Sequence, residues 1–138
     1  MLTVQKVLFL RKVDLFADLT TRDLGHVARI AREIDFPAGA VIVEEGGYGD
    51  ALYLIVGGQV TVTLGQRTLG VLGEAECFGE MAVLTGEVRS ASVRAATDCL
   101  VLQIEQADFQ EILSDHFEVV LAVIRTLCRR LRAADEGA

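Results

Sequence analysis

Residues 77–95 carry the side chains whose types and spacing could bind a small anion. Arg89 is followed by small residues, and the planar fork of an arginine binds a phosphate through two parallel hydrogen bonds. Gly79 allows close backbone approach, and a short helical turn over 80–84 would point free N–H groups at the anion. Glu80 fits beside an anion only if it faces away from it and accepts a hydrogen bond from a sugar hydroxyl. A small ligand with one phosphate charge and one free ribose hydroxyl matches both side chains.

Catalytic chemistry lacks the side chains that it would need. His26 and His116 are the two histidines, so the strand-rich middle of the chain has none, which disfavours a cupin-like metalloenzyme. The cysteines are far apart in the sequence and match neither a disulfide framework nor a zinc motif; they are Cys77, Cys99 and Cys128. We find no activated nucleophile and no paired acid and base. The sequence therefore predicts a binding module and not an enzyme, with no metal and no cofactor.

The elements that position these residues change period along the chain. Apolar residues at helical spacing predict helices over about 3–32, with Thr20 or Thr21 as the cap of the second one. From about 33 to 104, short apolar runs alternate with glycine-rich turns, and the run 51–56 fits a buried strand. This density of short strands predicts a mainly β fold, as a sandwich, a jelly roll or a small barrel.

The last third is predicted to be helical again, over about 107–132. Asp108 is expected to cap a short helix, and apolar residues then recur at helical spacing over 117–132. The arginines of this last helix are interpreted as a solvated face, since cations are favourable near a helix C-terminus; they are Arg125, Arg129, Arg130 and Arg132. With no internal repeat and no linker, we expect one domain over 1–138.

Composition narrows the class of protein further. With 138 residues, 51% of them hydrophobic and 24% charged, the chain is long enough for one globular domain with its own core. Its net charge of −7 disfavours non-specific binding to nucleic acid, which depends on neutralising phosphates. No apolar run reaches the length of a membrane span, and the first residues do not form a signal peptide. The cysteine usage fits a reducing compartment, so we expect a cytoplasmic location.

The segment 78–92, called the cassette below, resembles the phosphate-binding cassette of the cyclic nucleotide-binding domain family, as in catabolite activator protein-like domains and kinase regulatory subunits. The family pattern is Phe-Gly-Glu, two small or apolar residues, a leucine or similar residue, a short loop, and then Arg, a small residue, Ala and Ser or Thr. Here FGEMAVL at 78–84 and RSAS at 89–92 match without a gap. The glycine-rich segment 45–60 and the opening LFADL at 15–19 are also similar to the family.

Two positions depart from the family pattern. Val88 stands where a proline often precedes the arginine, and Gly47 stands where an acidic residue often follows a glycine. Neither change removes a side chain that the resemblance assigns to the ligand. The similarity covers about 13–132, which is nearly the whole chain.

The resemblance implies an eight-stranded β-roll with N-terminal helices and C-terminal helices that act as a lid. Arg89 would pair with the cyclic phosphate, and Glu80 would bind the ribose 2′-hydroxyl, helped by the backbone of Gly79. Backbone amides and a serine hydroxyl would complete the anion cage. The implied ligand-binding set is Phe78, Gly79, Glu80, Met81, Ala82, Arg89, Ser90, Ala91 and Ser92. The candidates for lid contact with the base are Leu127, Cys128 and Leu131.

The function implied by the resemblance is a cyclic nucleotide-binding regulatory or sensor domain whose C-terminal helix responds to the ligand. We expect cAMP more than cGMP, because Ser90 stands where members that favour cGMP tend to carry threonine. The alternative is a ligand-free protein-interaction or dimerisation module on the same fold, although the intact Glu80 and Arg89 argue against it. The expected partners are an effector domain of a larger protein or a second copy. A chain ending at 138 leaves no room for a helix-turn-helix, so we expect no nucleic-acid binding by this chain alone.

Overall fold

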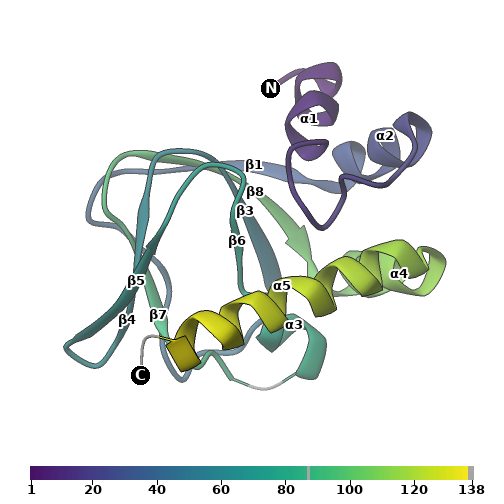
Figure 1. Ribbon diagram of the computed structural model, residues 1–138. Helices are drawn as coiled ribbons and strands as arrows, with labels where there is room; N and C mark the ends of the chain where they lie inside the picture. Colours follow the sequence, from purple (N-terminus) through teal and green to yellow (C-terminus); the bar gives the residue numbers. More distant parts are fainter. Residues whose placement is uncertain (87, 137–138) are drawn as a thin grey trace.

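Two four-stranded antiparallel sheets and five helices make up the part of the chain that the computed structural model describes, namely residues 1–86 and 88–136 without the side chains of 81, 82 and 134–136 (Figure 1). The helices are α1 (Thr3–Leu10), α2 (Thr21–Ile30), α3 (Glu80–Thr85), α4 (Gln106–Asp115) and α5 (Phe117–Glu136). The strands are β1 (Arg32–Phe36), β2 (Val41–Val43), β3 (Ala51–Gly57), β4 (Val60–Leu64), β5 (Arg67–Leu72), β6 (Cys77–Phe78), β7 (Ser92–Ala95) and β8 (Cys99–Glu105). This arrangement confirms the predicted fold class, an eight-stranded β-roll with flanking helices.

Neighbouring strands in each sheet are mostly distant in the sequence. The first sheet has the order β1-β8-β3-β6, and the second has the order β2-β7-β4-β5. In the first sheet, Arg32 of β1 lies opposite Gln103 of β8, and Ala51 of β3 lies opposite Glu105 of the same strand. The chain therefore passes repeatedly from one sheet to the other, as in a jelly roll. The short strand β6 pairs with β3, which places the start of the cassette at an edge of the first sheet.

Strand β3 is buried on both faces, which explains its continuous apolar sequence. Successive side chains of a strand point to opposite faces. Ala51, Tyr53 and Ile55 belong to an inner core between the two sheets. Leu52 and Leu54 belong to an outer core that the helices share with the first sheet. One strand therefore contributes to both cores of the molecule.

The N-terminal helices cover one end of the roll, on the opposite side from α3 (Figure 1). The side chain of Thr20 accepts a hydrogen bond from the backbone N–H of Asp23 at 3.2 Å, which confirms the predicted cap of the second helix. That helix ends at Ile30 and not at 32 as predicted. The reason is that Ala31 is already extended, with φ −79° and ψ 123°, and β1 begins at the next residue.

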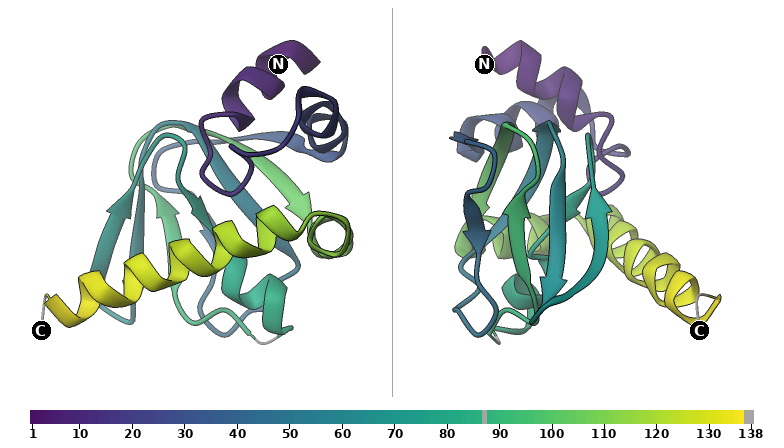
Figure 2. Two further views of the ribbon diagram at one scale, coloured as in Figure 1. Left: turned by 45° about the vertical axis from the view of Figure 1, so that its right-hand side comes forward. Right: turned by 90° about the vertical axis from the view of Figure 1, so that its left-hand side faces the viewer.

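The C-terminal helices follow β8 directly. Asp108 does not cap α4, contrary to the prediction, because Glu105 occupies the N-cap position without a side-chain cap hydrogen bond. Helix α5 buries Val119, Ala122 and Val123 in the outer core. From Ile124 onward most of its described side chains are exposed. The right-hand view of Figure 2 shows this C-terminal part standing away from the strands.

Candidate functional site

A cavity of about 200 Å³, called the cassette cavity below, lies between the cassette, the second sheet and α5. Its apolar wall comes from strands of both sheets and from the loop before Arg89, and the charged side chains among its described lining residues are Glu80, Arg89 and Arg130. The full lining is Val43, Val62, Leu72, Phe78, Gly79, Glu80, Thr85, Val88, Arg89, Ser90, Ala91, Val93 and Arg130. An apolar space with a few converging polar groups is the usual form of a small-molecule site.

Arg89 is a buried cation, only 5% exposed. Its guanidinium donates to the carbonyl oxygens of Gly79 at 3.1 Å and Ala51 at 2.7 Å, and it lies 6.0 Å from the ring centroid of Tyr53. Its Nε is buried without a hydrogen-bond partner, and no carboxylate among the described residues lies within ion-pair distance of it. Burial lowers the pKa of this guanidinium, because desolvation penalises the charged form, while Tyr53 and Asp50 act in the opposite direction.

Gly79 is required where it stands because Arg89 packs directly against it. Its φ of +90° lies in the left-handed region, which side chains rarely adopt. A Cβ there would collide with the guanidinium of Arg89 and would lie 2.8 Å from the carbonyl oxygen of Ala51. Gly79 and Arg89 therefore form one packed unit at the N-terminus of α3.

Glu80 begins α3 and is buried, yet its partner is not Arg89. Its carboxylate accepts from Arg130, which lies fifty positions away in the sequence on α5. The same guanidinium donates to the carbonyl oxygen of Cys77 at 2.7 Å. This contact was not predicted from the sequence. The pattern of apolar and polar residues in α5 identifies Arg130 only as one of several polar residues of that helix. Glu80 and Arg89 therefore do not form an ion pair with each other in the described structure.

The rest of the cassette is tied into the roll by aromatic and polar contacts. Phe78 stacks on Tyr53 with ring centroids 5.1 Å apart and an interplanar angle of 13°. The hydroxyl of Ser92 accepts from the backbone N–H of Glu45 at 2.9 Å. The backbone N–H of Arg89 donates to the carbonyl oxygen of Gly47 at 2.6 Å. The glycine-rich loop before β3 is therefore hydrogen bonded to the cassette.

The structure brings six of the predicted ligand-binding residues to the cavity: Phe78, Gly79, Glu80, Arg89, Ser90 and Ala91. Ser92 is not among the lining residues and is engaged with Glu45 instead. The side chains of Met81 and Ala82 lie outside the described part of the chain. None of the predicted lid residues lines the cavity, since Leu127 packs on the outer core while Cys128 and Leu131 are exposed.

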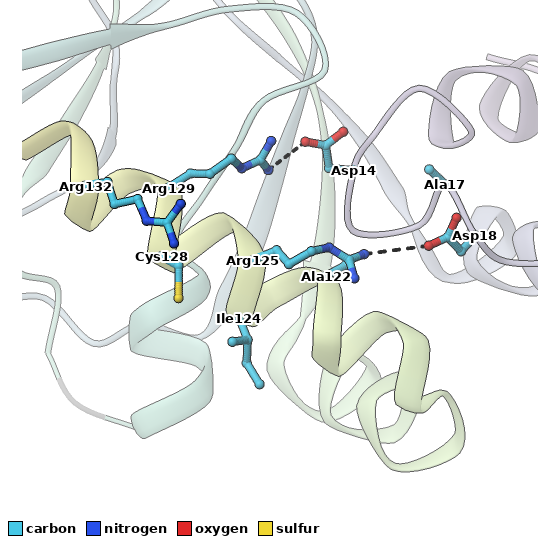
Figure 3. Close-up of a pocket in the computed structure, with 9 residues that line it drawn as sticks. All are labelled: Asp14, Ala17, Asp18, Ala122, Ile124, Arg125, Cys128, Arg129 and Arg132. Atoms are coloured by element: carbon cyan, nitrogen blue, oxygen red, sulfur yellow. Dashed lines mark hydrogen bonds and ion pairs between the residues drawn. The ribbon is translucent and has the colours of Figure 1, made fainter.

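A larger hollow of about 620 Å³ lies on the other side of α5, against the loop that precedes α2 (Figure 3). Here Arg129 donates to Asp14 at 2.7 Å, and Arg125 lies 3.7 Å from Asp18. All four side chains are at least 59% exposed, so solvent weakens both pairs. Arg125 and Arg129 therefore lie on a solvated face, as predicted, although each has an exposed aspartate as partner. Arg130 departs from the prediction, because its carboxylate partner Glu80 is buried.

The described residues hold no cluster of side chains that could bind a metal ion. Among the described helices, none combines the length and the apolar character that crossing a bilayer requires. The charged side chains among the described lining of the site are thus Glu80, Arg89 and Arg130, beside an apolar wall.

Comparison with protein-family models matches residues 33–116 to the cyclic nucleotide-binding domain. The chain is 38% identical over 118 residues to a cyclic nucleotide-gated potassium channel of Rhizobium etli, covering 86% of this chain and 33% of the channel. It is 34% identical over 118 residues to a cGMP-dependent protein kinase of Caenorhabditis briggsae, covering 80% of this chain and 16% of the kinase. The chain thus spans a third or less of the length of these two curated relatives.

Among solved structures, the chain resembles the catabolite activator protein of Thermus thermophilus, with a TM-score of 0.80 and 33% identity. The match covers 90% of this chain and 61% of that one. The similarity therefore extends over most of the fold described above.

Proposed function

Since the chain belongs to the cyclic nucleotide-binding domain family, we propose that it binds a cyclic nucleotide in the cassette cavity and acts as a regulatory sensor. The observation that carries this proposal is Arg89, a buried cation without a carboxylate partner among the described residues and with an unpaired Nε. A buried charge is costly unless it is paired. A phosphate bound at the cavity would supply the missing negative charge and the missing acceptor.

Glu80 supports the second half of the recognition, because a carboxylate accepts hydrogen bonds from hydroxyls. It lies at the first position of α3, next to the glycine that carries Arg89, so phosphate and sugar hydroxyl are bound by adjacent parts of the chain. The side chains of Val43, Val62 and Leu72 give the cavity an apolar wall. This wall suits the flat surface of a nucleobase.

We infer a preference for cAMP over cGMP. Ser90 lines the cavity directly after Arg89, and its hydroxyl is carried on a shorter side chain than that of the threonine seen in family members that favour cGMP. One of the relatives similar to this chain is named for cGMP. The choice of base therefore rests on Ser90 and is decided by measurement.

The proposed role is binding with a conformational output and not catalysis. Helix α5 contacts the cavity through Arg130, so a ligand that changes the cassette also changes the environment of α5. A ligand shifts a conformational equilibrium only by binding its two states unequally. The effector that receives this signal is expected to be another domain or a second copy of the chain.

Isothermal titration calorimetry of the purified chain tests the proposal, with cAMP, cGMP and 5′-AMP as ligands. We expect micromolar or tighter binding of cAMP, weaker binding of cGMP and much weaker binding of 5′-AMP. The absence of heat and of a thermal shift with both cyclic nucleotides would reject a sensor function. Tighter binding of cGMP would reject the inference from Ser90 alone.

A second function, association through α5, is favoured by one specific observation. Apolar side chains recur along α5 at alternating spacings of four and three residues and are exposed; they are Phe117, Leu121, Ile124, Cys128 and Leu131. Heptad spacing of this kind forms the seam of a coiled coil. We propose a second copy as the partner, because the exposed seam of one copy offers the matching seam for another. A parallel pair would place Cys128 of each copy side by side.

The oligomeric state tests this second proposal. Light scattering of the chain should report a dimer, and mild oxidation should link the copies through Cys128. Leu121→Lys should yield a monomer, while Leu64→Lys, a change at an exposed leucine of β4, should not. A monomer in the unmodified chain at high concentration would reject it.

A further inference from the structure

We propose that Arg130 is the resident counter-ion of Glu80: it holds the C-terminal part of α5 against the cassette and cancels a carboxylate charge that would otherwise repel a bound phosphate. The inference rests on the proposed function, because it assigns a role within the same cavity. Arg130 reaches two acceptors on this side of the roll, the carboxylate of Glu80 and the carbonyl oxygen of Cys77 at 2.7 Å. It thereby contacts the chain on both sides of Gly79, at Cys77 and at Glu80.

The burial of this pair sets it apart from the other ion pairs of α5. The side chain of Glu80 is 4% exposed and that of Arg130 is 39% exposed, whereas the partners in the Arg129–Asp14 pair are 60% and 66% exposed. A carboxylate taken out of water needs a partner, and removing that partner leaves an uncompensated buried charge. Exposed pairs are screened by solvent and contribute little. Arg130 therefore matters for the state of Glu80, while Arg129 serves as a matched control on the same helix.

The charges around the cavity give the reason why a phosphate site would need Arg130. Its described lining has two cations, Arg89 and Arg130, and one anion, Glu80, which leaves one positive charge for a ligand with one negative charge. Without Arg130, the charges of Arg89 and Glu80 cancel and the cavity no longer attracts an anion. Charges interact more strongly near buried groups such as Glu80 and Arg89 than they do in bulk water.

The packing of α5 gives the pair a second consequence. The residues of α5 that are fully buried in the outer core end at Val123. Beyond that point Leu127 is half-buried, and Ile124 and Leu131 are more than half exposed. Among the described side chains of α5, Arg130 is therefore the one that holds this part of the helix at the cavity. A ligand hydroxyl that donates to the Glu80 carboxylate changes the contact between Glu80 and Arg130. Binding of the sugar is thereby coupled to the position of α5.

A double-mutant cycle on nucleotide affinity tests the counter-ion role. Arg130→Gln is expected to weaken cAMP binding by about tenfold or more, because Glu80 then cancels the positive charge of Arg89. In the Glu80→Gln background, where there is no charge to cancel, the same change should cost less than about threefold. Arg130→Lys should restore part of the affinity, because the charge is kept. Equal losses from Arg130→Gln in both backgrounds would overturn the counter-ion role.

Hydrogen exchange of the ligand-free protein tests the attachment of α5 without any nucleotide. Amides of residues 124–136 should exchange faster in Arg130→Gln than in the parent chain, and Arg129→Gln should leave them nearly unchanged. Equal exchange in the two variants would overturn the attachment. If the parent chain binds no cyclic nucleotide, the proposed function fails, and the exchange comparison still decides whether Arg130 holds α5 to Glu80.

Discussion

Arg89 occupies the space in which a side chain of Gly79 would stand, and it donates to the carbonyl oxygen of that glycine at 3.1 Å. The glycine therefore forms part of the surface on which the Arg89 guanidinium packs, in addition to allowing the turn. The same guanidinium also donates to the carbonyl oxygen of Ala51, so Arg89 connects the cassette to the central strand β3. Changes at these positions should separate effects on ligand binding from effects on folding.

Gly79→Ala should weaken cyclic nucleotide binding by at least about tenfold, because the new methyl group displaces Arg89. It should also lower the free energy of unfolding by about 1–3 kcal/mol, since a left-handed φ strains any residue with a Cβ. Gly86→Ala is the matched control, because Gly86 has a φ of +72° but nothing within 4 Å of an added Cβ. Calorimetry and urea denaturation measure both quantities. Equal loss of affinity in the two variants would contradict the role of Gly79.

Arg89→Ala should keep the fold and weaken cyclic nucleotide binding by on the order of 2–5 kcal/mol, the scale for removing one half of a buried charge contact. The free energy of unfolding should change little, because the variant also removes a buried cation that lacks a carboxylate partner among the described residues. Arg94→Ala, at an exposed arginine that donates to Gly39, should bind like the parent chain. Unchanged affinity in Arg89→Ala would show that the anion binds elsewhere.

The two serines that flank Ala91 should respond differently to alanine. Ser92→Ala removes the acceptor of the Glu45 backbone N–H and should cost about 0.5–1.5 kcal/mol of stability. Ser90→Ala should leave stability unchanged, because Ser90 is exposed, and should weaken nucleotide binding, because it lines the cavity. Thermal denaturation and calorimetry on both variants give the comparison. The reverse assignment of the two effects would show that Ser92 is the ligand-binding hydroxyl.

Gly58→Ala should be among the most destabilising glycine changes, costing more than about 2 kcal/mol. Gly58 has a φ of +94°, and a Cβ there would lie 2.9 Å from the Sγ of Cys99 and 3.0 Å from its Cα. Gly65→Ala carries only the conformational strain, because nothing lies within 4 Å of an added Cβ. Urea denaturation of the two variants isolates the steric part. A smaller loss at Gly58 than at Gly65 would speak against the close packing of the turn after β3 on the start of β8.

The cysteines should differ in their reaction with iodoacetamide at neutral pH. Burial raises the pKa of the Cys77 thiol, since desolvation penalises the thiolate, and Arg130 opposes this shift without cancelling it. A raised pKa leaves less thiolate, which is the reactive species, so Cys77 should stay unmodified in the folded protein. Cys128 is exposed and should be alkylated first. Mass spectrometry of the peptides checks the order, and prior labelling of Cys77 would contradict the described burial.

The fold class and most of the cassette could be predicted from the sequence because their determinants are local. Glycine spacing, strand alternation and the order of Phe78, Gly79, Glu80 and Arg89 all lie within short windows. The contact between Glu80 and Arg130 could not be predicted in this way, since it depends on where a helix fifty residues away comes to lie. Arg130 has no local feature that separates it from Arg129.

The prediction of Asp108 as a helix cap failed for a related reason. A cap prediction assumes a loop before the helix, whereas β8 continues without a break into α4 and puts Glu105 at the N-cap. The backbone N–H of Gln106, the first residue of α4, then donates to the carbonyl oxygen of Asp50, on a distant segment. Tertiary pairing, and not the local preference of an aspartate, decides where this helix begins.

Because β3 is buried on both faces, its register is not fixed by the alternation of apolar and polar residues, as it is in half-exposed strands. In such strands, sliding by one residue would bury polar groups, so alternation alone keeps the alignment correct. Sliding β3 would exchange Tyr53 with its leucine neighbours, and both faces would remain apolar. Polar contacts at defined positions therefore specify the register of β3. Arg89 donates to the carbonyl oxygen of Ala51, and Gln103 donates to the hydroxyl of Tyr53. Arg89, proposed above as the phosphate-binding residue, therefore also fixes the position of β3 relative to the cassette.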